Sequence, residues 1–171
     1  MRQSRLMRHL LTGPRAVNRA FPTNSLKAIE QATQAGEQRH RGQIRFAVEA
    51  ALPLAAIRAG QTPRQRALDV FSQLRIWDTE HNSGVLIYLL LADRAVEIIA
   101  DRGINARIPP TRWQAICAAM QTEFRQQHFE AGVIAGIQAV AAHLAEYFPA
   151  DGTQANELPD APVVLGGDYS P

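Results

Sequence analysis

Residues 84–100 read GVLIYLLLADRAVEIIA, and this stretch decides the fold. Residues 85–91 form a continuous apolar run, which is typical of a central strand that is covered on both faces. Asp93 and Arg94 interrupt the run with a tight polar break, and residues 95–100 are mainly apolar again. The stretch therefore predicts a β-hairpin made of two antiparallel strands.

An earlier segment, residues 43–52, predicts another strand by its alternation. The residues expected in the core alternate with those expected at the surface: Ile44, Phe46, Val48 and Ala50, against Arg45, Ala47 and Glu49. This pattern is typical of a half-buried strand. Residues 62–74 predict an amphipathic helix that begins at Thr62 and Pro63. Because a strand–helix–strand unit pairs its strands in parallel, residues 43–52 should run parallel to the first hairpin strand.

Further helices are predicted before and after these strands. One begins near Thr23 and should end near Gly42, another begins at Thr111, and the last covers residues 129–148. Their apolar residues recur every three or four positions, as on the buried face of a surface helix. The sequence therefore predicts an α/β fold, in which a short mixed sheet of two parallel strands plus an antiparallel hairpin strand is sandwiched by helices.

Charge is distributed unevenly along the chain, although the formal net charge is only +2. Residues 1–22 hold no acid and carry these basic side chains: Arg2, Arg5, Arg8, Arg15 and Arg19. Residues 149–171 hold no base and carry these acids: Asp151, Glu157, Asp160 and Asp168. We therefore divide the chain into a basic arm (1–22), an α/β domain (23–148) and an acidic tail (149–171) that we expect to be loosely ordered.

The basic arm allows two interpretations. It either packs on the domain or frays, or it contacts a protein partner or an anionic membrane surface. No apolar run approaches the roughly 18 residues that a membrane-spanning helix needs, and the arm lacks the apolar stretch of a secretory signal. We expect a cytoplasmic protein, which lies at the periphery of the inner membrane if the arm binds there.

The predicted topology brings polar residues that are distant in sequence to one end of the sheet. The first two strands begin at this end, and the third strand ends there. The polar residues next to these strand ends are Glu37, His40, Asp78, Glu80, His81, Asn82, Asp101 and Arg102. We expect these side chains to converge on one edge.

This converging edge allows two interpretations. The carboxylates of Glu37, Asp78, Glu80 and Asp101 would suit a hard cation such as Ca²⁺, and a nearby His40 or His81 would admit a transition metal. Alternatively, these side chains cap turns and remain solvated. Residues 78–89 are not an EF-hand, because glycine stands at loop position seven and leucine at position twelve.

Several functional classes lack their sequence motifs. The chain has no Gly-rich phosphate-binding loop, nucleophile elbow, paired-cysteine metal site or His-Glu-x-x-His motif. The single cysteine, Cys117, lies on an apolar helical face, which predicts a buried structural thiol. Nucleic-acid binding is not expected, because the basic residues of the middle region are balanced by acids.

Residues 82–89, which read NSGVLIYL, are followed by DRAVEII at 93–99 and by Gly103 and Ile104, and together they resemble the TPM domain family. With the strand at 44–48, the helix that holds Phe71 and the final helix, the resemblance covers about residues 24–148. It implies an α/β sandwich with a short mixed sheet. It also implies calcium binding in some members and acid phosphatase activity in some plant members.

The resemblance carries over Asn82, Gly84 and Arg94, and we add Asp78 from the adjoining loop as a hypothesis. Family members often show Gly-x-Gly after the third strand, where this chain has DRG at 101–103. The NELPD segment at 156–160 is similar to that of a short cytoplasmic bacterial subgroup.

Two functions follow from these observations, beside the binding of an unidentified small ligand. The first is a non-catalytic accessory module that acts with membrane-associated protein partners through its basic arm. The second is a metal-dependent phosphatase, in which a cation held at the converging edge polarises a phosphoryl oxygen. Arg102 would then hold the phosphate rather than Arg94, because Arg94 is predicted at the far end of the sheet.

Overall fold

The computed structural model describes residues 4–152 and 155–166 of the chain. Within these residues, one mixed sheet has the strand order β3-β2-β1-β4. Its strands are β1 (Gln43–Glu49), β2 (Gly84–Leu90), β3 (Ala95–Ala100) and β4 (Val163–Leu165). β1 and β2 are parallel, and β2 and β3 form the predicted antiparallel hairpin. The predicted α/β fold with a short mixed sheet is therefore confirmed.

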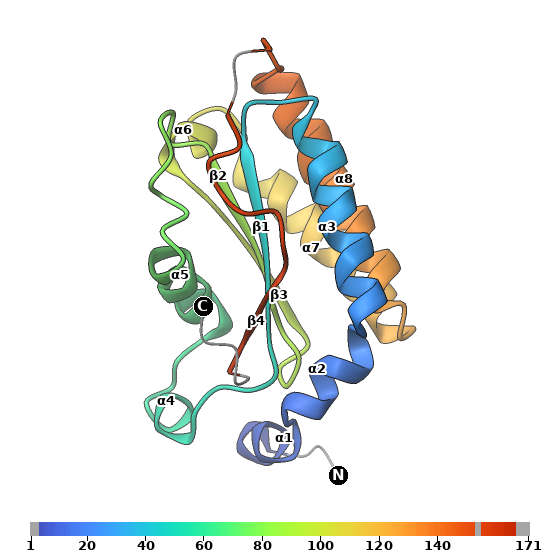
Figure 1. The fold of residues 1–171 in the computed structure, drawn as a ribbon. Helices are drawn as coiled ribbons and strands as arrows, with labels where there is room; N and C mark the ends of the chain where they lie inside the picture. Colours follow the sequence, from blue (N-terminus) through green and yellow to red (C-terminus); the bar gives the residue numbers. More distant parts are fainter. Residues whose placement is uncertain (1–3, 153–154, 167–171) are drawn as a thin grey trace.

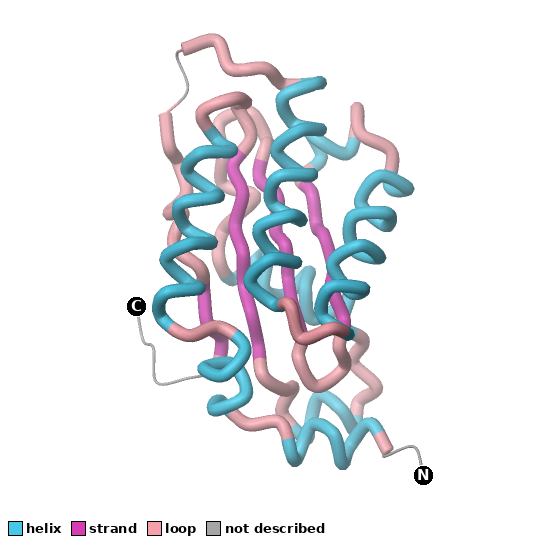
Figure 2. The backbone as a smooth tube through the Cα atoms, turned by 90° about the vertical axis from the view of Figure 1, so that its right-hand side faces the viewer, coloured by secondary structure: helices cyan, strands magenta, loops and turns pink. Residues whose placement is uncertain are grey.

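Helices cover both faces of the sheet and one of its ends (Figure 1). Three long helices lie across one face, as Figure 2 shows: α3 (Thr23–Glu37), α7 (Pro110–Arg125) and α8 (Phe129–Tyr147). On the opposite face, α5 (Pro63–Gln73) contacts β2 and β3. Short helices complete the described chain: α1 (Arg5–Leu11), α2 (Pro14–Ala20), α4 (Leu54–Arg58) and α6 (Arg102–Asn105). None of the helices described is long and apolar enough to cross a bilayer.

The sheet separates two apolar cores. Phe46 and Ile87 point toward α3, α7 and α8, where they pack in the larger core with Val140. Leu86 packs on the other side with Val70 of α5. Every residue of β2 is buried, as predicted for a central strand covered on both faces.

Two local features of the sequence determine how helices begin and pack. Thr62 starts α5 with a capping box, since its side chain accepts from Gln65 N while Gln65 Oε1 accepts from Thr62 N. Gly136 of α8 lies against α7, where an added Cβ would stand 2.4 Å from Met120 Sδ. The glycine therefore permits the close approach of the two helices.

The expectation of a half-buried β1 is wrong, because every residue of this strand is buried. The face expected in solvent carries Arg45 and Glu49, which are 8% and 4% exposed. Arg45 Nη1 donates to the carbonyl oxygens of Pro159 and Ala161. Glu49 pairs with Arg66 of α5. The charged residues of β1 are therefore buried with partners, as buried charges must be.

Residues 155–166 differ from the loosely ordered tail that composition predicts. They run along the sheet and add β4 in parallel to β1, with Val164 opposite Val48. A strand as short as Val163–Leu165 leaves little signal in sequence, and its pairing depends on the free edge of β1. Asp168 lies outside the described residues.

The helices differ from the predictions at one boundary and in two additional short helices. α3 ends at Glu37 and not near Gly42, because Arg41 N donates to Phe148 O and His40 forms a bridge with Pro149. The short helices α4 and α6 were not predicted. The side chain of Asp101 accepts from Arg102 N at the start of α6.

The N-terminal arm packs on the domain. Val17 of α2 and Phe21 are each 1% exposed and belong to the larger core. Phe21 lies against Phe46 of β1, with ring centroids 5.6 Å apart. α1 contacts α4 beneath the sheet (Figure 1). The packed interpretation describes the position of the arm in the fold, and contact of the arm with a partner or a membrane surface stays a prediction.

Candidate functional site

The end of the sheet where β1 and β2 begin, which we call the entry end, brings together several of the predicted polar residues. Arg102 Nε donates to Asn82 Oδ1 at 3.0 Å, and Asp101 stands beside them at the end of β3. A Cβ at Gly103 would lie 2.6 Å from the carbonyl oxygens of His81 and Asn82. Glycine therefore lets these two loops touch.

Three of the four acids proposed as metal ligands interact with a helix end, with an arginine or with solvent. The Asp101 side chain accepts from Arg102 N at 2.7 Å and caps α6. Asp78 forms an exposed ion pair with Arg75 at 2.6 Å. The side chain of Glu80 is 80% exposed. Helix capping thus occupies Asp101 Oδ1, an ion pair holds Asp78 and solvent surrounds Glu80, while Asp101 Oδ2 is buried without a hydrogen-bond partner among the described residues.

The fourth acid, Glu37, is used by the backbone of β1. Its Oε1 accepts from Ile44 N at 2.7 Å. Burial raises the pKa of Glu37 to about 8; the Ile44 N–H opposes this rise and the nearby Asp160 adds to it. Glu37 therefore holds a proton near neutral pH, and a protonated carboxyl group is a weak ligand for a cation.

The two histidines of the entry end lie in different surroundings. His40 is fully buried, its Nδ1 lies 3.1 Å from Gly42 O, and burial lowers its pKa to about 4. The side chain of His81 is 59% exposed. Over residues 4–152 and 155–166, no group of three or more His, Cys, Asp or Glu side chains is spaced to hold a metal ion. The cation site remains a prediction.

A pocket of about 260 Å³ opens at the entry end. Its lining residues are Arg41, His81, Ser83, Gly103, Arg107 and Phe148. The Arg107 guanidinium lies 5.3 Å from the centre of the Phe148 ring. Among these described lining residues there is no carboxylate, so the charge of the pocket favours an anion over a cation.

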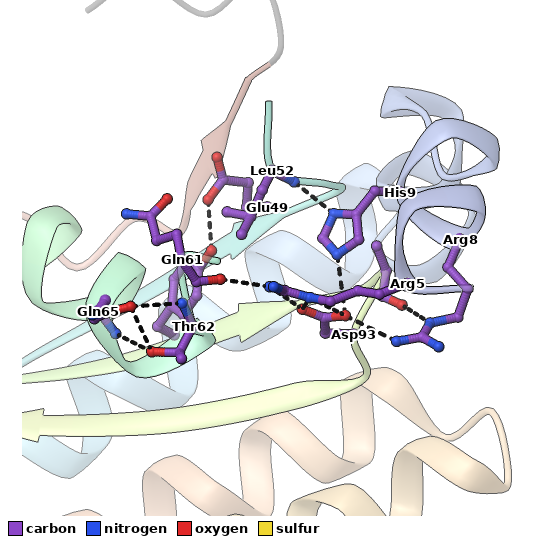
Figure 3. A network of polar contacts seen from close by, with 11 residues as sticks. Arg5, Arg8, His9, Glu49, Leu52, Gln61, Thr62, Gln65 and Asp93 are labelled. Atoms are coloured by element: carbon purple, nitrogen blue, oxygen red, sulfur yellow. Dashed lines mark hydrogen bonds and ion pairs between the residues drawn. The ribbon is translucent and has the colours of Figure 1, made fainter. Parts of the chain in front are cut away.

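The opposite end, which holds the β2–β3 turn and which we call the hairpin end, is organised around Asp93 (Figure 3). Arg5 and Arg8 of α1 pair with its carboxylate at 2.8 and 3.1 Å, and His9 Nε2 lies 3.1 Å from Asp93 Oδ1. Burial alone would raise the pKa of Asp93, but the hydrogen bonds from α1 outweigh it and hold the pKa below its ordinary value. We call Arg5, Arg8, His9 and Asp93 the Asp93 cluster.

The cluster ties α1 to two loops as well as to the hairpin. His9 Nδ1 accepts from Leu52 N at 2.9 Å, so the imidazole carries its proton on Nε2, toward Asp93. Arg5 Nη2 donates to Gln61 O at 2.8 Å. The segments after β1, before α5 and after β2 thus meet on one short helix (Figure 3).

This attachment determines which side of α1 faces outward. The polar face of the helix turns toward Asp93, and its large apolar side chains remain exposed. They are Leu6, Met7, Leu10 and Leu11, at 37%, 47%, 56% and 68% exposure. α1 therefore packs on the domain through its polar face and exposes its apolar face, whereas an ordinary surface helix buries its apolar face.

A second buried polar group joins α5 to the sheet. Arg66 holds Glu49 through two hydrogen bonds of 2.8 and 2.9 Å. Tyr88 Oη donates to Glu49 Oε2 at 2.6 Å. Burial, followed by the charge of Glu49, raises the pKa of Tyr88. This bidentate pair has the geometry of a structural ion pair, and it lies on the face where the sequence predicted solvent.

Sequence reasoning missed both buried groups, although one signal was present. Arg5, Arg8 and His9 are spaced three and four apart, so they share a helical face opposite the leucines. Only the fold shows that Asp93 meets this face. Cys117, predicted to be buried, is only partly buried, and this burial raises the pKa of its thiol to about 11, as expected for an inert thiol.

Comparisons with known proteins agree with this fold. The sequence pattern of the TPM domain matches residues 19–143. Among solved structures, the BA42 protein from the psychrophilic bacterium Bizionia argentinensis is 30% identical with a TM-score of 0.73, over 84% of this chain and 94% of that one. The N-terminal domain of a P. gingivalis protein is 19% identical with a TM-score of 0.59, over 75% and 78%, and shares the fold alone. No curated protein matches the chain.

Proposed function

The chain belongs to the TPM domain family, and on that premise we propose that it is a non-catalytic interaction module that attaches to an anionic membrane surface through α1. The family match covers residues 19–143 and does not include α1. Attachment would therefore be a property of this chain's own N-terminal helix. The domain behind the helix would then be held where it meets membrane-associated proteins.

The observation that carries the proposal is the outward apolar face of α1. Leu10 and Leu11 are more than half exposed, and Met7 lies beside them. Leu54 of α4, a helix that contacts α1, is 40% exposed and adds a further exposed apolar side chain. Helices that lie in a membrane interface bury such a row of side chains among the lipid acyl chains.

Exposed arginines near this face supply the attraction for anionic lipid. Arg15 and Arg19 of α2 and Arg58 of α4 are exposed. A basic residue close to an anionic bilayer contributes about 1 kcal/mol to attachment. Arg5 and Arg8 serve another purpose, since they are paired with Asp93 and hold the helix in its orientation.

Co-sedimentation with lipid vesicles tests the proposal. The protein should sediment with vesicles of phosphatidylserine and phosphatidylcholine, and only weakly with phosphatidylcholine alone. Replacing Leu6 and Leu10 together by serine should abolish the association, because the inserted apolar area is lost. Raising the salt concentration should weaken it, because exposed charges are then screened.

A matched control is available on α5, where Leu68 is 48% exposed. Leu68→Ser removes an equally exposed leucine far from α1 and should leave vesicle association unchanged. If wild-type protein does not sediment with anionic vesicles, or if Leu68→Ser loses as much association as the double variant, the proposal is wrong.

Metal-dependent hydrolysis of a phosphomonoester, with Ca²⁺ as the cation, is the second candidate. It is supported by the basic pocket of the entry end, which suits a phosphate, and by the adjoining Asp101 and Asn82. A bound cation would polarise the phosphoryl oxygen. The acids available to it would be Asp78, Glu80 and Asp101, after displacement of the partners described above.

A calcium titration followed by backbone amide shifts tests this candidate. Saturable shifts confined to residues 78–84 and 101–103, lost in Asp101→Asn, would support it, and a phosphomonoesterase assay would follow. No shifts at millimolar calcium would contradict it. Equal hydrolysis by wild type and Asp101→Asn would identify a contaminating enzyme.

A further inference from the structure

A pocket of about 910 Å³ opens at the hairpin end, and neither proposed function uses it as a binding site. Three segments that are distant in sequence form its walls: α1 and α2, the end of β2 with the β2–β3 turn, and the end of α7 with the start of α8. We call it the hairpin pocket. Its volume lies within the range of pockets that bind small molecules.

The hairpin pocket combines an apolar lining with basic side chains. Its large apolar residues are Leu11, Leu89, Leu91, Phe124 and Phe129. Its charged residues are Arg8, Arg19, Arg94, Arg125 and a single carboxylate, Asp93. An anionic group with an apolar body would find partners for both of its parts here.

The single carboxylate does not neutralise these arginines. Asp93 is already bound by Arg5, Arg8 and His9. Across the described residues, Arg19, Arg94 and Arg125 have no hydrogen bond or ion pair to a carboxylate. Three guanidinium groups therefore remain available for an anion.

The Asp93 cluster also places one wall of the hairpin pocket. Arg8 Nε donates to Ala92 O at 3.1 Å, which holds α1 against the hairpin turn. Arg94 adopts a left-handed backbone conformation in that turn, with φ 52°. The cluster thus holds α1, which carries Leu11, beside the hairpin, whereas α2, which carries Arg19, is held in the core by Val17.

From these observations we propose that the hairpin pocket binds an amphiphilic anion, a carboxylate or phosphate head on an acyl chain. Arg94 and Arg125 hold the head, and the apolar lining receives the chain. The site shares Leu11 and Arg19 with the surface proposed for membrane attachment, but Leu6 and Leu10, which are replaced to test attachment, do not line it.

Calorimetric titration of the full chain with decanoate and with decyl phosphate, each below its micelle-forming concentration, tests the proposal. Saturable binding is expected for at least one of the two. Affinity should rise by up to about fourfold for each CH₂ group added to the chain. Decyltrimethylammonium has the same chain with a cationic head and should not bind, and inorganic phosphate alone should bind far more weakly.

Variants locate the site. Replacing Arg94 and Arg125 together by glutamine should weaken binding at least tenfold. Arg112→Gln removes an exposed arginine of α7 that does not line the pocket, and it should bind as wild type does. The Leu6→Ser, Leu10→Ser double variant should also bind as wild type, so that failure of vesicle attachment and failure of this site are separable.

Other outcomes overturn the proposal. Absence of saturable binding of both anions would do so, as would equal binding of the cationic amphiphile or equal affinity in the Arg94, Arg125 variant. A preference for decyl phosphate would indicate a phospholipid-like ligand and a preference for decanoate a fatty acid. Either preference supports the site.

Discussion

The two ends of the sheet differ in how their charged side chains are paired. At the entry end, the acids act locally, since Asp101 caps α6 and Glu37 accepts from Ile44 N. At the hairpin end, Asp93 gathers three basic side chains of α1, a helix that is distant in sequence. Polar residues that converge in space therefore need not form a site, because local backbone groups can occupy them first.

The hairpin end should be the more sensitive to loss of one charge, and Glu49 should show the largest effect. Glu49→Gln leaves the partly buried Arg66 without a counter-charge, so we expect a loss of about 3 kcal/mol in the free energy of unfolding. Tyr88→Phe removes one hydrogen bond from the same carboxylate and should cost about 1 kcal/mol. Urea unfolding of both variants measures the difference, and equal losses would show that the ion pair adds nothing beyond a hydrogen bond.

The Asp93 cluster should come next. Asp93→Asn leaves Arg5, Arg8 and His9 without their carboxylate. Because the two arginines are partly exposed, the expected loss of stability is about 2 kcal/mol rather than the full value for a buried pair.

Asp78→Asn is the matched control at the entry end. It removes an acid whose ion pair with Arg75 is exposed on both sides, so the free energy of unfolding should change by less than about 0.5 kcal/mol. Equal effects of the two substitutions in urea unfolding would remove the contrast between the ends of the sheet.

A further effect concerns the pH dependence of the entry end. The folded pKa of Glu37, about 8, lies above its ordinary value, so the folded state binds more protons than the unfolded state between pH 4.5 and about 8. Stability contributed by this group is present below its unfolded pKa and is lost as pH rises through about 8. His40, whose folded pKa is about 4, acts in the opposite sense below pH 6.5.

Between pH 6.5 and 8 the effect of Glu37 should therefore stand alone. We expect stability to fall by roughly 1.5 kcal/mol over this range, and the fall should disappear in Glu37→Gln. Urea unfolding at several pH values checks this. A fall of the same size in the variant would assign it to another group.

The hairpin and the parallel pairing of β1 and β2 were predictable because local pattern and connection rules determine them. β4 was not, since Val163–Leu165 gains its structure from the edge of β1 and lies in a polar, Pro-rich segment. The alternating pattern of β1 likewise predicted that Arg45 and Glu49 face solvent. These two charges are buried only because residues 155–166 and α5 supply their partners. Tertiary contacts override local pattern at these positions.

The candidate sites show the same limit. Strand directions sufficed to place Asn82, Asp101 and Arg102 at one end. Asp101 caps helix α6, which was not predicted. The orientation of α1 depends on its ion pairs with Asp93. These features follow from the assembled fold, and residue type and spacing do not determine them.

One measurement compares the two ends directly: broadening of backbone amide signals by a spin-labelled lipid in anionic bicelles. Attachment through α1 predicts broadening at residues 5–11 and 54–58, while residues 78–84 and 101–107 keep their intensity. Broadening at the entry end instead, or no broadening at either end, would contradict the proposal that α1 attaches this protein to a membrane.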